Sequence, residues 1–299
     1  MKASVCSWWS GTLFLVLLAL LAMGIGCGGG EPQKTANPAE AKYAEVEKAM
    51  ADVKFEKAIS LTSEIISKYT DSEFAEKARV LRTILLAGVS AGYGKMAEIY
   101  IEGTGKARKD SGQFRATAWD YYRKQRAGAL AFYESADYCL KNYSETHQCI
   151  IQIKFPDQDI VTNHSLELVR RGNLVDSEKR LGGEEDELRN GVITMLTLFL
   201  GHGIDRALAR KDLESGSHRL EHSEYFATIS SQLLANQKLF ARAALNEPGR
   251  AQAYFKKAVE MHAFTEKLLK AKPNKDVQKE ADKVKADIEA LKKKGMKVS

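Results

Sequence analysis

The sequence predicts an all-α protein made of stacked antiparallel helix pairs. Ala, Leu, Glu and Lys are abundant, and the 299 residues include only five prolines, a composition that favours helices. Apolar residues recur at intervals of three and four along almost the whole chain, which is the spacing of one helix face. Very short turns separate the first helices, so consecutive helices must run in opposite directions and cover each other's apolar faces.

The first 26 residues are predicted to be a secretory signal peptide. Lys2 gives the segment a positive start, residues 13–25 form an apolar run, and small residues precede Cys27. A positive start, a short apolar run and small residues before a fixed point are the parts of an export signal. The alternatives are an uncleaved signal anchor and ordinary cleavage near Ala22 or Gly26.

Cys27 resembles the lipid-attachment cysteine of bacterial lipoproteins. Gly26 and Cys27 fit the family's pattern, whereas Gly24 stands where the family usually has Leu. The resemblance implies that Cys27 is the first residue of the mature chain and carries the acyl chains that anchor it to a membrane. Residues 27–39 are Gly-rich and then polar with two prolines, so they are predicted to form a flexible, lipid-anchored linker.

These N-terminal features predict that the chain lies in a bacterial cell envelope. Gly28 is not the Asp that in some bacteria retains lipoproteins in the inner membrane, which favours the outer membrane and its periplasmic face. Much of the formal net charge of +6 comes from lysines between Lys267 and Lys297. No aromatic residues lie between those lysines, and an exported protein rarely meets DNA, so this stretch is interpreted as a solvated helix face and no nucleic acid partner is expected.

Residues 40–295 are predicted to form the helical domain. Apolar residues fall at helical spacing over residues 43–53, 55–69 and 74–85. Thr70-Asp71-Ser72 lies between the last two segments and has the composition of a turn followed by a helix N-cap. Three amphipathic helices joined by short turns are therefore expected in this part of the chain.

Residues 40–86 resemble a tetratricopeptide repeat, which is a helix–turn–helix unit of about 34 residues. Phe55-Glu56-Lys57-Ala58-Ile59 is similar to the start of the repeat's second helix, where an aromatic residue precedes a small packing residue by three positions. Residues 68–75 are similar to the closing turn of the repeats in outer-membrane-assembly lipoproteins, although Thr70 stands where that family has Pro. The resemblance implies a short α-solenoid whose concave face binds proteins or peptides.

Residues 248–294 are a second segment similar to this repeat. Tyr254-Phe255-Lys256-Lys257-Ala258 repeats the aromatic-to-alanine spacing, and Pro248 stands at a plausible helix start. Apolar residues over 277–291 form one clean stripe before a lysine-rich end. This pattern is typical of a terminal capping helix with a polar outer face.

The middle of the chain is predicted to be helical without a visible repeat. Residues 114–143 keep helical spacing and are rich in aromatic residues, which makes this segment the candidate binding surface. Residues 150–155 are a candidate extended piece, Gly182-Gly183 with its charged neighbours is expected to form a loop, and residues 192–200 are expected to form the most buried helix. The candidate binding residues are Trp119, Tyr121, Tyr122, Phe132 and Tyr133.

Two cysteines remain in the helical domain, Cys139 and Cys149. Ten residues along one unbroken helix would place them about 15 Å apart, too far for a disulfide. A turn within residues 142–146 would bring them closer. The sequence leaves open whether they form a disulfide in an oxidising compartment or are two small core residues.

The sharpest motif is His218-Arg219-Leu220-Glu221-His222. Two histidines at positions i and i+4 of a helix can share a Zn²⁺ ion, with a Glu between them as a general base. The order resembles the inverted zinc-peptidase motif, but that family takes a third ligand, a Glu, from a helix well downstream, where this chain has a lysine-rich tail. His218 and His222 are therefore interpreted as ordinary helix residues. No metal or other cofactor is expected.

Three functional hypotheses follow. The first is a membrane-tethered, non-catalytic scaffold or adaptor that binds other envelope proteins. The second is a ligand-binding accessory lipoprotein of a solute transporter, with a pocket lined by the aromatic residues of segment 114–143. The third is a zinc-dependent hydrolase that uses His218, Glu221 and His222. Because the motif lacks a third ligand, we expect a binding protein rather than an enzyme.

Overall fold

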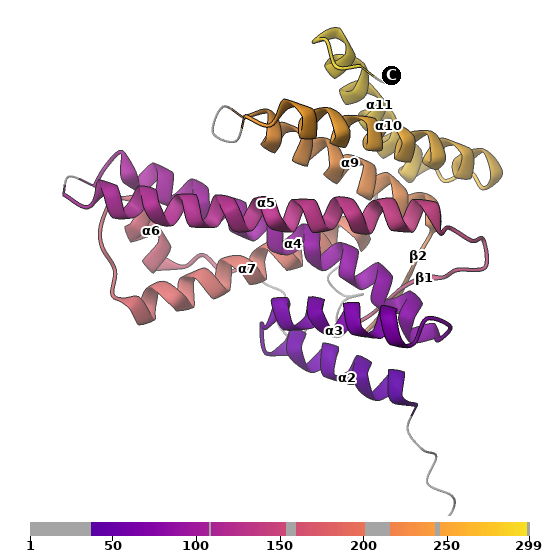
Figure 1. Ribbon diagram of the computed structural model, residues 1–299, viewed down its shortest axis with the longest axis horizontal. Helices are drawn as coiled ribbons and strands as arrows, with labels where there is room; N and C mark the ends of the chain where they lie inside the picture. Colours follow the sequence, from indigo (N-terminus) through magenta and orange to yellow (C-terminus); the bar gives the residue numbers. More distant parts are fainter. Residues whose placement is uncertain (1–36, 108, 154–159, 201–215, 243–245, 298–299) are drawn as a thin grey trace, which may run out of the picture. The chain divides into compact units, whose positions relative to one another are not determined.

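Helices dominate the part of the chain that the computed structural model describes, which is residues 37–107, 109–153, 160–200, 216–242 and 246–297 (Figure 1). The predicted signal peptide, Cys27 and most of the linker 27–39 lie outside these residues. The all-α fold class is confirmed. The described helices are α2 (Pro38–Ala51), α3 (Phe55–Lys68), α4 (Glu73–Thr104), α5 (Ser111–Lys141), α6 (His164–Arg170), α7 (Ser177–Leu200), α9 (His222–Ala241), α10 (Pro248–Ala271) and α11 (Lys275–Lys293).

The first three helices match the expected pattern. Helix α2 begins at Pro38, where a proline without an N–H group suits the first helical position, so the helical domain starts two residues before position 40. The turn after α3 ends at Ser72, whose hydroxyl accepts a hydrogen bond from the backbone N–H of Ala75 at 3.2 Å and caps α4. Ala58 is fully buried, as a small packing residue should be.

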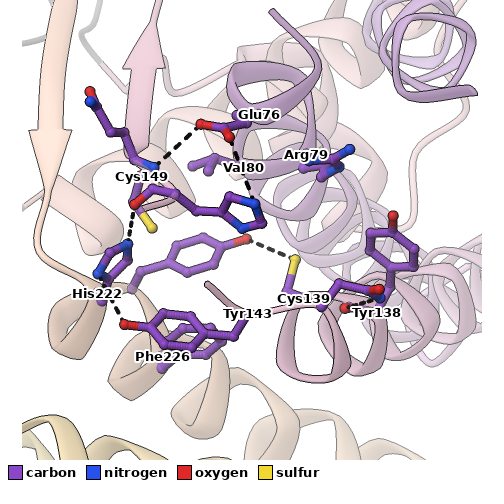
Figure 2. A pocket seen from close by; sticks show the side chains of 13 residues that line it. Glu76, Arg79, Val80, Tyr138, Cys139, Tyr143, Cys149, His222 and Phe226 are labelled. Carbon is purple, nitrogen blue, oxygen red and sulfur yellow. Dashed lines mark hydrogen bonds and ion pairs between the residues drawn. The ribbon is translucent and has the colours of Figure 1, made fainter. Parts of the chain in front are cut away.

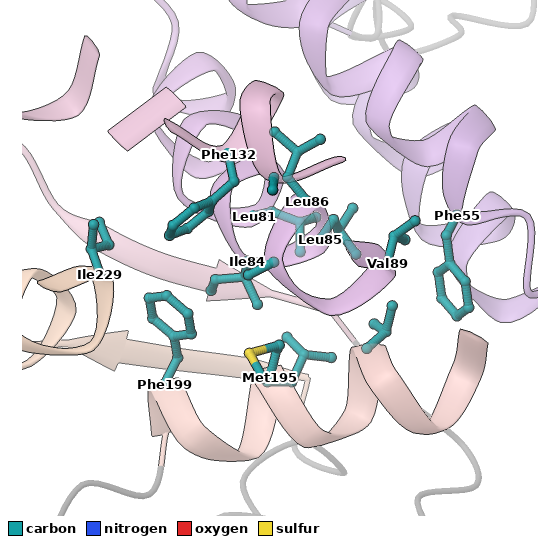
Figure 3. Packing of buried hydrophobic residues seen from close by; sticks show 14 of the residues in the cluster. Phe55, Leu81, Ile84, Leu85, Leu86, Val89, Phe132, Met195, Phe199 and Ile229 are labelled. Carbon is teal, nitrogen blue, oxygen red and sulfur yellow. The ribbon is translucent and has the colours of Figure 1, made fainter. Parts of the chain in front are cut away.

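Helix α4 is the element on which most of the others pack. It has 32 residues and is therefore about 48 Å long; α3, α5 and α7 all lie against it (Figure 1). Figure 3 shows Ile84 of α4 between Phe132 of α5 and Phe199 of α7, and all three side chains are fully buried. Because it is buried on several sides, α4 carries apolar or small residues around most of its circumference.

Helices α4 and α7 cross at glycines. A Cβ atom on Gly191 would lie 2.6 Å from the carbonyl oxygen of Gly88 and 2.7 Å from the backbone nitrogen of Gly92. A Cβ atom on Gly88 would lie 2.6 Å from the Cα atom of Val192. These distances are shorter than van der Waals contact, so the two backbones can approach this closely only because neither helix has a side chain there.

Two short strands form an antiparallel pair, β1 (Cys149–Gln152) and β2 (Ser217–Leu220), with Cys149 opposite Leu220 and Gln152 opposite Ser217. The expected extended piece at residues 150–155 is therefore present over its first residues. The hydroxyl of Tyr43 in α2 donates a hydrogen bond to the backbone oxygen of Gln152 at 3.0 Å. This bond ties the strand pair to the first helix.

Helices α9, α10 and α11 pack mainly on one another, and two ion pairs join α10 and its N-cap to α5. The Nε and Nη2 atoms of Arg126 in α5 donate to the two carboxylate oxygens of Glu247, the N-cap residue of α10, at 2.5 and 3.0 Å. Lys257 of α10 binds Asp137 of α5 at 2.6 Å. The apolar stripe of α11 is buried as expected, at Val277, Ala281, Val284 and Ile288.

The expected loop at Gly182-Gly183 is wrong, because both residues lie inside α7. A Cβ atom on Gly183 would lie 2.6 Å from the hydroxyl oxygen of Ser165 and 2.9 Å from the side-chain oxygen of Asn163, which caps α6. This glycine therefore permits close packing of α6 on α7 and does not break the helix. Residues 192–200 are mostly buried, with Thr194 exposed, but they form only the last part of α7, and α4 is buried over more of its length.

The finer prediction of stacked repeat pairs is not confirmed. Helices α2 and α3 have 14 residues each, which suits a repeat, but α4 and α5 have 32 and 31. The long helices cover more than one neighbour, and α7 crosses α4 directly. A search of the described helices finds none that is both long and apolar enough to cross a membrane.

The glycine crossing gives a stability prediction with an internal control. Gly191→Ala should lower the free energy of unfolding by roughly 1–3 kcal/mol, because the added methyl group overpacks the α4–α7 contact. Gly182→Ala lies in the same helix with no atom within 4 Å of the new Cβ, and it should raise stability by about 0.5–1 kcal/mol. Urea unfolding of both variants measures the difference. Equal stabilities for the two variants would show that the helices are not in close contact there.

Candidate binding sites

The first candidate site is an aromatic and basic patch on α5. Trp119 is 38% exposed and Tyr122 is half-buried; their rings meet edge to face with centroids 5.8 Å apart. Arg115 and Arg126 lie one turn before Trp119 and one turn after Tyr122, on the same helix face. We call these four residues the α5 patch. Glu247 lies against Arg126, and this guanidinium lowers the pKa of the Glu247 carboxyl.

The five predicted binding residues do not form one surface. Tyr121 and Phe132 are 7% and 0% exposed, and Tyr133 is half-buried with its ring centroid 4.9 Å from that of Tyr254 in α10. Neighbouring residues of a helix point about 100° apart, so Tyr121 faces α4 when Tyr122 faces outward. Tyr121 and Phe132 are therefore core residues and Tyr133 is half-buried against α10, whereas Trp119 is exposed and Tyr122 is half-buried on the outer face of α5.

Tyr121 belongs instead to a polar network between α4, α5 and α7 that no sequence motif predicts. Its centre is the buried carboxylate of Glu184, which accepts a hydrogen bond from the hydroxyl of Tyr100 at 2.8 Å and lies 3.4 Å from Arg180. Burial raises the pKa of both tyrosines above its ordinary value. The network satisfies a buried charge and fixes the three helices relative to one another.

The second candidate site lies between the C-terminal end of α5, the strand pair and the start of α9 (Figure 2). Here His222 holds residues 142–148, the connection from α5 to β1, against α9. Its Nε2 atom donates a hydrogen bond to the backbone oxygen of His147 at 2.6 Å, because a carbonyl oxygen can only accept. Its Nδ1 atom can then accept from the hydroxyl of Tyr143, 3.4 Å away.

An aromatic cluster packs against this contact between His222 and residues 142–148. The ring of Tyr143 meets His222, Phe226 and Phe264 edge to face, with centroid distances of 5.1, 5.7 and 4.8 Å. Such pairs stabilise a contact beyond the area they bury. The connection 142–148 is therefore held in one position over α9 and α10.

A groove of about 610 Å³ opens beside this cluster, and its size is within the range of small-ligand sites. One wall is the connection 142–148 with the first residue of β1, and the other consists of the end of β2, the start of α9 and the end of α10. We call it the α9 groove. It is lined by Tyr143, Glu145, Thr146, His147, Gln148, Cys149, Arg219, Leu220, Glu221, His222, Ser223, Leu268, Ala271 and Lys272.

The predicted helical placement of His218 and His222 is wrong. His218 lies in β2 opposite Ile151, and His222 is the first residue of α9. Pairing with β1 overrides the helical spacing of this segment, so the two rings do not share a helix face. Glu221 binds Lys272 at 2.7 Å. Within the described ranges, no group of three or more His, Cys, Asp or Glu side chains is arranged to hold a metal ion.

Cys139 and Cys149 are both free thiols. Helix α5 ends at Lys141, between the two cysteines, but they do not form a disulfide. The sulfur of Cys139 lies 3.6 Å from the hydroxyl of Tyr225 and 3.8 Å from that of Thr83. Burial raises the pKa of both thiols, so they remain protonated at neutral pH. Cys149 is a small, buried packing residue, and Cys139 packs half-buried beside it.

Glu224 is a buried carboxyl in the first turn of α9, with 7% of the residue exposed. Burial raises its pKa from an ordinary value of 4.5 to about 7, since a low-dielectric environment disfavours the charged form. A backbone hydrogen bond with Glu221 acts in the opposite direction and lowers the pKa of Glu224. The start of α9 therefore contains an acid that titrates near neutral pH.

Comparison of the chain with protein-family models, curated proteins and solved structures finds no match.

Glu224 makes stability depend on pH in a defined direction. Because its pKa is higher in the folded state, its contribution is fully present below pH 4.5 and is lost as the pH rises through about 7. Glu224→Gln stays neutral, so between pH 5 and pH 8 its free energy of unfolding should fall less than that of the wild type, by on the order of 1–3 kcal/mol. Urea unfolding at several pH values measures this, with the exposed Glu178→Gln as control. Parallel pH profiles for wild type and Glu224→Gln would contradict the assignment.

Proposed function

We propose that this chain is a lipid-anchored protein of the bacterial cell envelope that binds other envelope proteins and catalyses no reaction itself. The observation that carries the proposal is the α5 patch, in which Trp119 and Tyr122 are accessible between two arginines. Trp, Tyr and Arg are the residues on which binding energy at protein interfaces concentrates. The export signal and Cys27 support the location.

The α5 patch is well suited to binding because it is already ordered. Helix α5 packs on α4, and both carboxylate oxygens of Glu247 accept hydrogen bonds from Arg126. A preformed surface loses little conformational entropy when a partner binds. The patch can therefore contribute affinity with few residues.

The lipid on Cys27 would hold this surface near the membrane, facing the periplasm from the outer membrane. A Gly-rich linker of about ten residues has a root-mean-square length of about 17 Å. This length lets the domain turn and tilt while it stays close to the lipid headgroups. In this proposal the α2–α3 pair and the α10–α11 pair are degenerate tetratricopeptide-like units, which the full burial of Ala58 and Ala258 supports.

The second candidate function, a ligand-binding accessory lipoprotein of a solute transporter, is favoured by the α9 groove. Its volume and mixed lining fit a small organic ligand. Of the predicted aromatic segment 114–143, Tyr143 lines this groove, whereas Trp119 and Tyr122 do not. The two candidates therefore use different faces of the molecule and can be tested separately.

Replacing Trp119 and Tyr122 by Ala should abolish most partner binding through the α5 patch. Loss of two central aromatic anchors typically costs 2 kcal/mol or more each, or at least about 30-fold in affinity. In-cell crosslinking followed by mass spectrometry measures partner recovery. Tyr138→Ala, which removes an exposed tyrosine elsewhere on the same helix, is the matched control. An unchanged set of partners with an intact circular dichroism spectrum would refute the proposed site.

Cys27→Ser should abolish membrane anchoring. Without a thiol no thioether lipid can form, so the variant should leave the membrane fraction or accumulate as an uncleaved precursor. Fractionation and mass spectrometry of the mature N-terminus measure both outcomes. A Cys27→Ser chain that is processed and retained like the wild type would show that the anchor is not this lipid.

A further inference from the structure

We infer that the α9 groove binds a zwitterionic ligand of the amino-acid or short-peptide class, with Arg219 receiving its carboxylate and Glu145 its ammonium group. This inference gives the second candidate function a ligand class and does not depend on partner binding by the α5 patch. It rests on the observation that, among the described residues, other charged side chains of the groove are already in ion pairs, whereas Arg219 and Glu145 are not.

Part of the lining of the groove is apolar. Leu220, Leu268 and Ala271 line it together with the ring of Tyr143, whose other contacts are the aromatic residues described above. Leu220 is only 2% exposed, so Leu268, Ala271 and Tyr143 provide most of the accessible apolar lining. An apolar lining of this kind suits an aliphatic or aromatic side chain of the ligand.

Arg219 provides the positive charge. It follows His218 and precedes the buried Leu220 in β2, and strand alternation turns its side chain to the outer face of the strand pair. Its Nη2 atom donates to the side-chain oxygen of Gln148 at 2.7 Å, which positions the guanidinium on the groove wall. No carboxylate of the described chain is paired with Arg219, so its remaining N–H groups can bind a ligand carboxylate in two-point fashion.

Lys272 does not make the groove a general anion site. Its ammonium group is bound by Glu221 at 2.7 Å, and Asn274 donates to the other carboxylate oxygen at 3.2 Å. These bonds lower the pKa of Glu221, which keeps the ion pair formed at neutral pH. Because the charges of Lys272 and Glu221 neutralise each other, the pair adds no net charge to the groove.

Glu145 provides the negative charge. It is exposed on the connection 142–148, and among the described residues its carboxylate has no hydrogen-bond or ion-pair partner. Since the Lys272–Glu221 pair is neutral as a whole, the described residues of the groove offer one unpaired cation and one unpaired anion beside an apolar lining. A ligand with free carboxylate and ammonium groups and an apolar side chain satisfies all three.

A set of four dipeptide probes tests this assignment on the purified full chain in lipid nanodiscs. The probes are alanylphenylalanine with both termini free, its N-acetylated form, its C-terminal amide, and the form blocked at both ends. Ligand-observed NMR titration measures each dissociation constant. The free dipeptide should bind about tenfold more tightly than either singly blocked form, and the doubly blocked form should bind most weakly.

Variants assign each end of the ligand to its residue. Arg219→Gln should weaken only the probes with a free carboxylate, and Glu145→Gln only those with a free amine, each by about tenfold. Arg171→Gln, an exposed arginine outside the groove, is the matched control and should change nothing. Partner recovery through the α5 patch should be unaffected by either groove variant.

Three results would overturn the inference. One is that none of the four probes binds at millimolar concentration. Another is that the free dipeptide binds no better than a singly blocked form. The third is that Arg219→Gln weakens the amine-only probe as much as the carboxylate-only probe. None of these outcomes bears on Trp119 and Tyr122, so failure here is distinguishable from failure of the proposed protein-binding function.

Discussion

The close approach of α4 and α7 is the constraint on which the rest of the fold depends. Gly88 and Gly92 of α4 meet Gly191 of α7 without intervening side chains, so the two backbones pack at a distance that larger residues would forbid. This contact leaves the other sides of α4 to be covered by α3 and α5. A long central helix buried on several sides then fixes the direction of every helix that packs on it.

Both candidate sites take their geometry from this arrangement. The inner face of α5 packs on α4, so Tyr121 and Phe132 are buried in the core. Trp119 and Tyr122 lie on the outer face of the helix. The α9 groove forms beside residues 142–148, which connect the end of α5 to β1. There His222 holds the connecting residues against α9, and one strand of the pair packs on α4.

Apolar periodicity predicted most of the helices because it reports which face each helix buries. It could not predict β2, since the pairing of residues 217–220 with a strand about 70 positions earlier is a non-local contact that overrides local spacing. It also placed Gly182-Gly183 in a loop, because a glycine chosen for close helix packing looks the same in sequence as a helix breaker. Within segment 114–143 the sequence marked an aromatic helix correctly. It could not tell which aromatic residues face α4, nor foresee the buried carboxylate of Glu184 that Tyr100 and Arg180 contact.

Native-state hydrogen exchange of the backbone amides tests the central role of α4 most directly. If α4 is the element on which the fold depends, amides in its middle, around Gly88 and Gly92, should exchange only through global unfolding, with opening free energies equal to that of the whole domain. The terminal helix α11, which packs mainly on α9 and α10, should open at a lower free energy. Exchange from the middle of α4 by local opening, while α9 and α10 remain protected, would contradict this account.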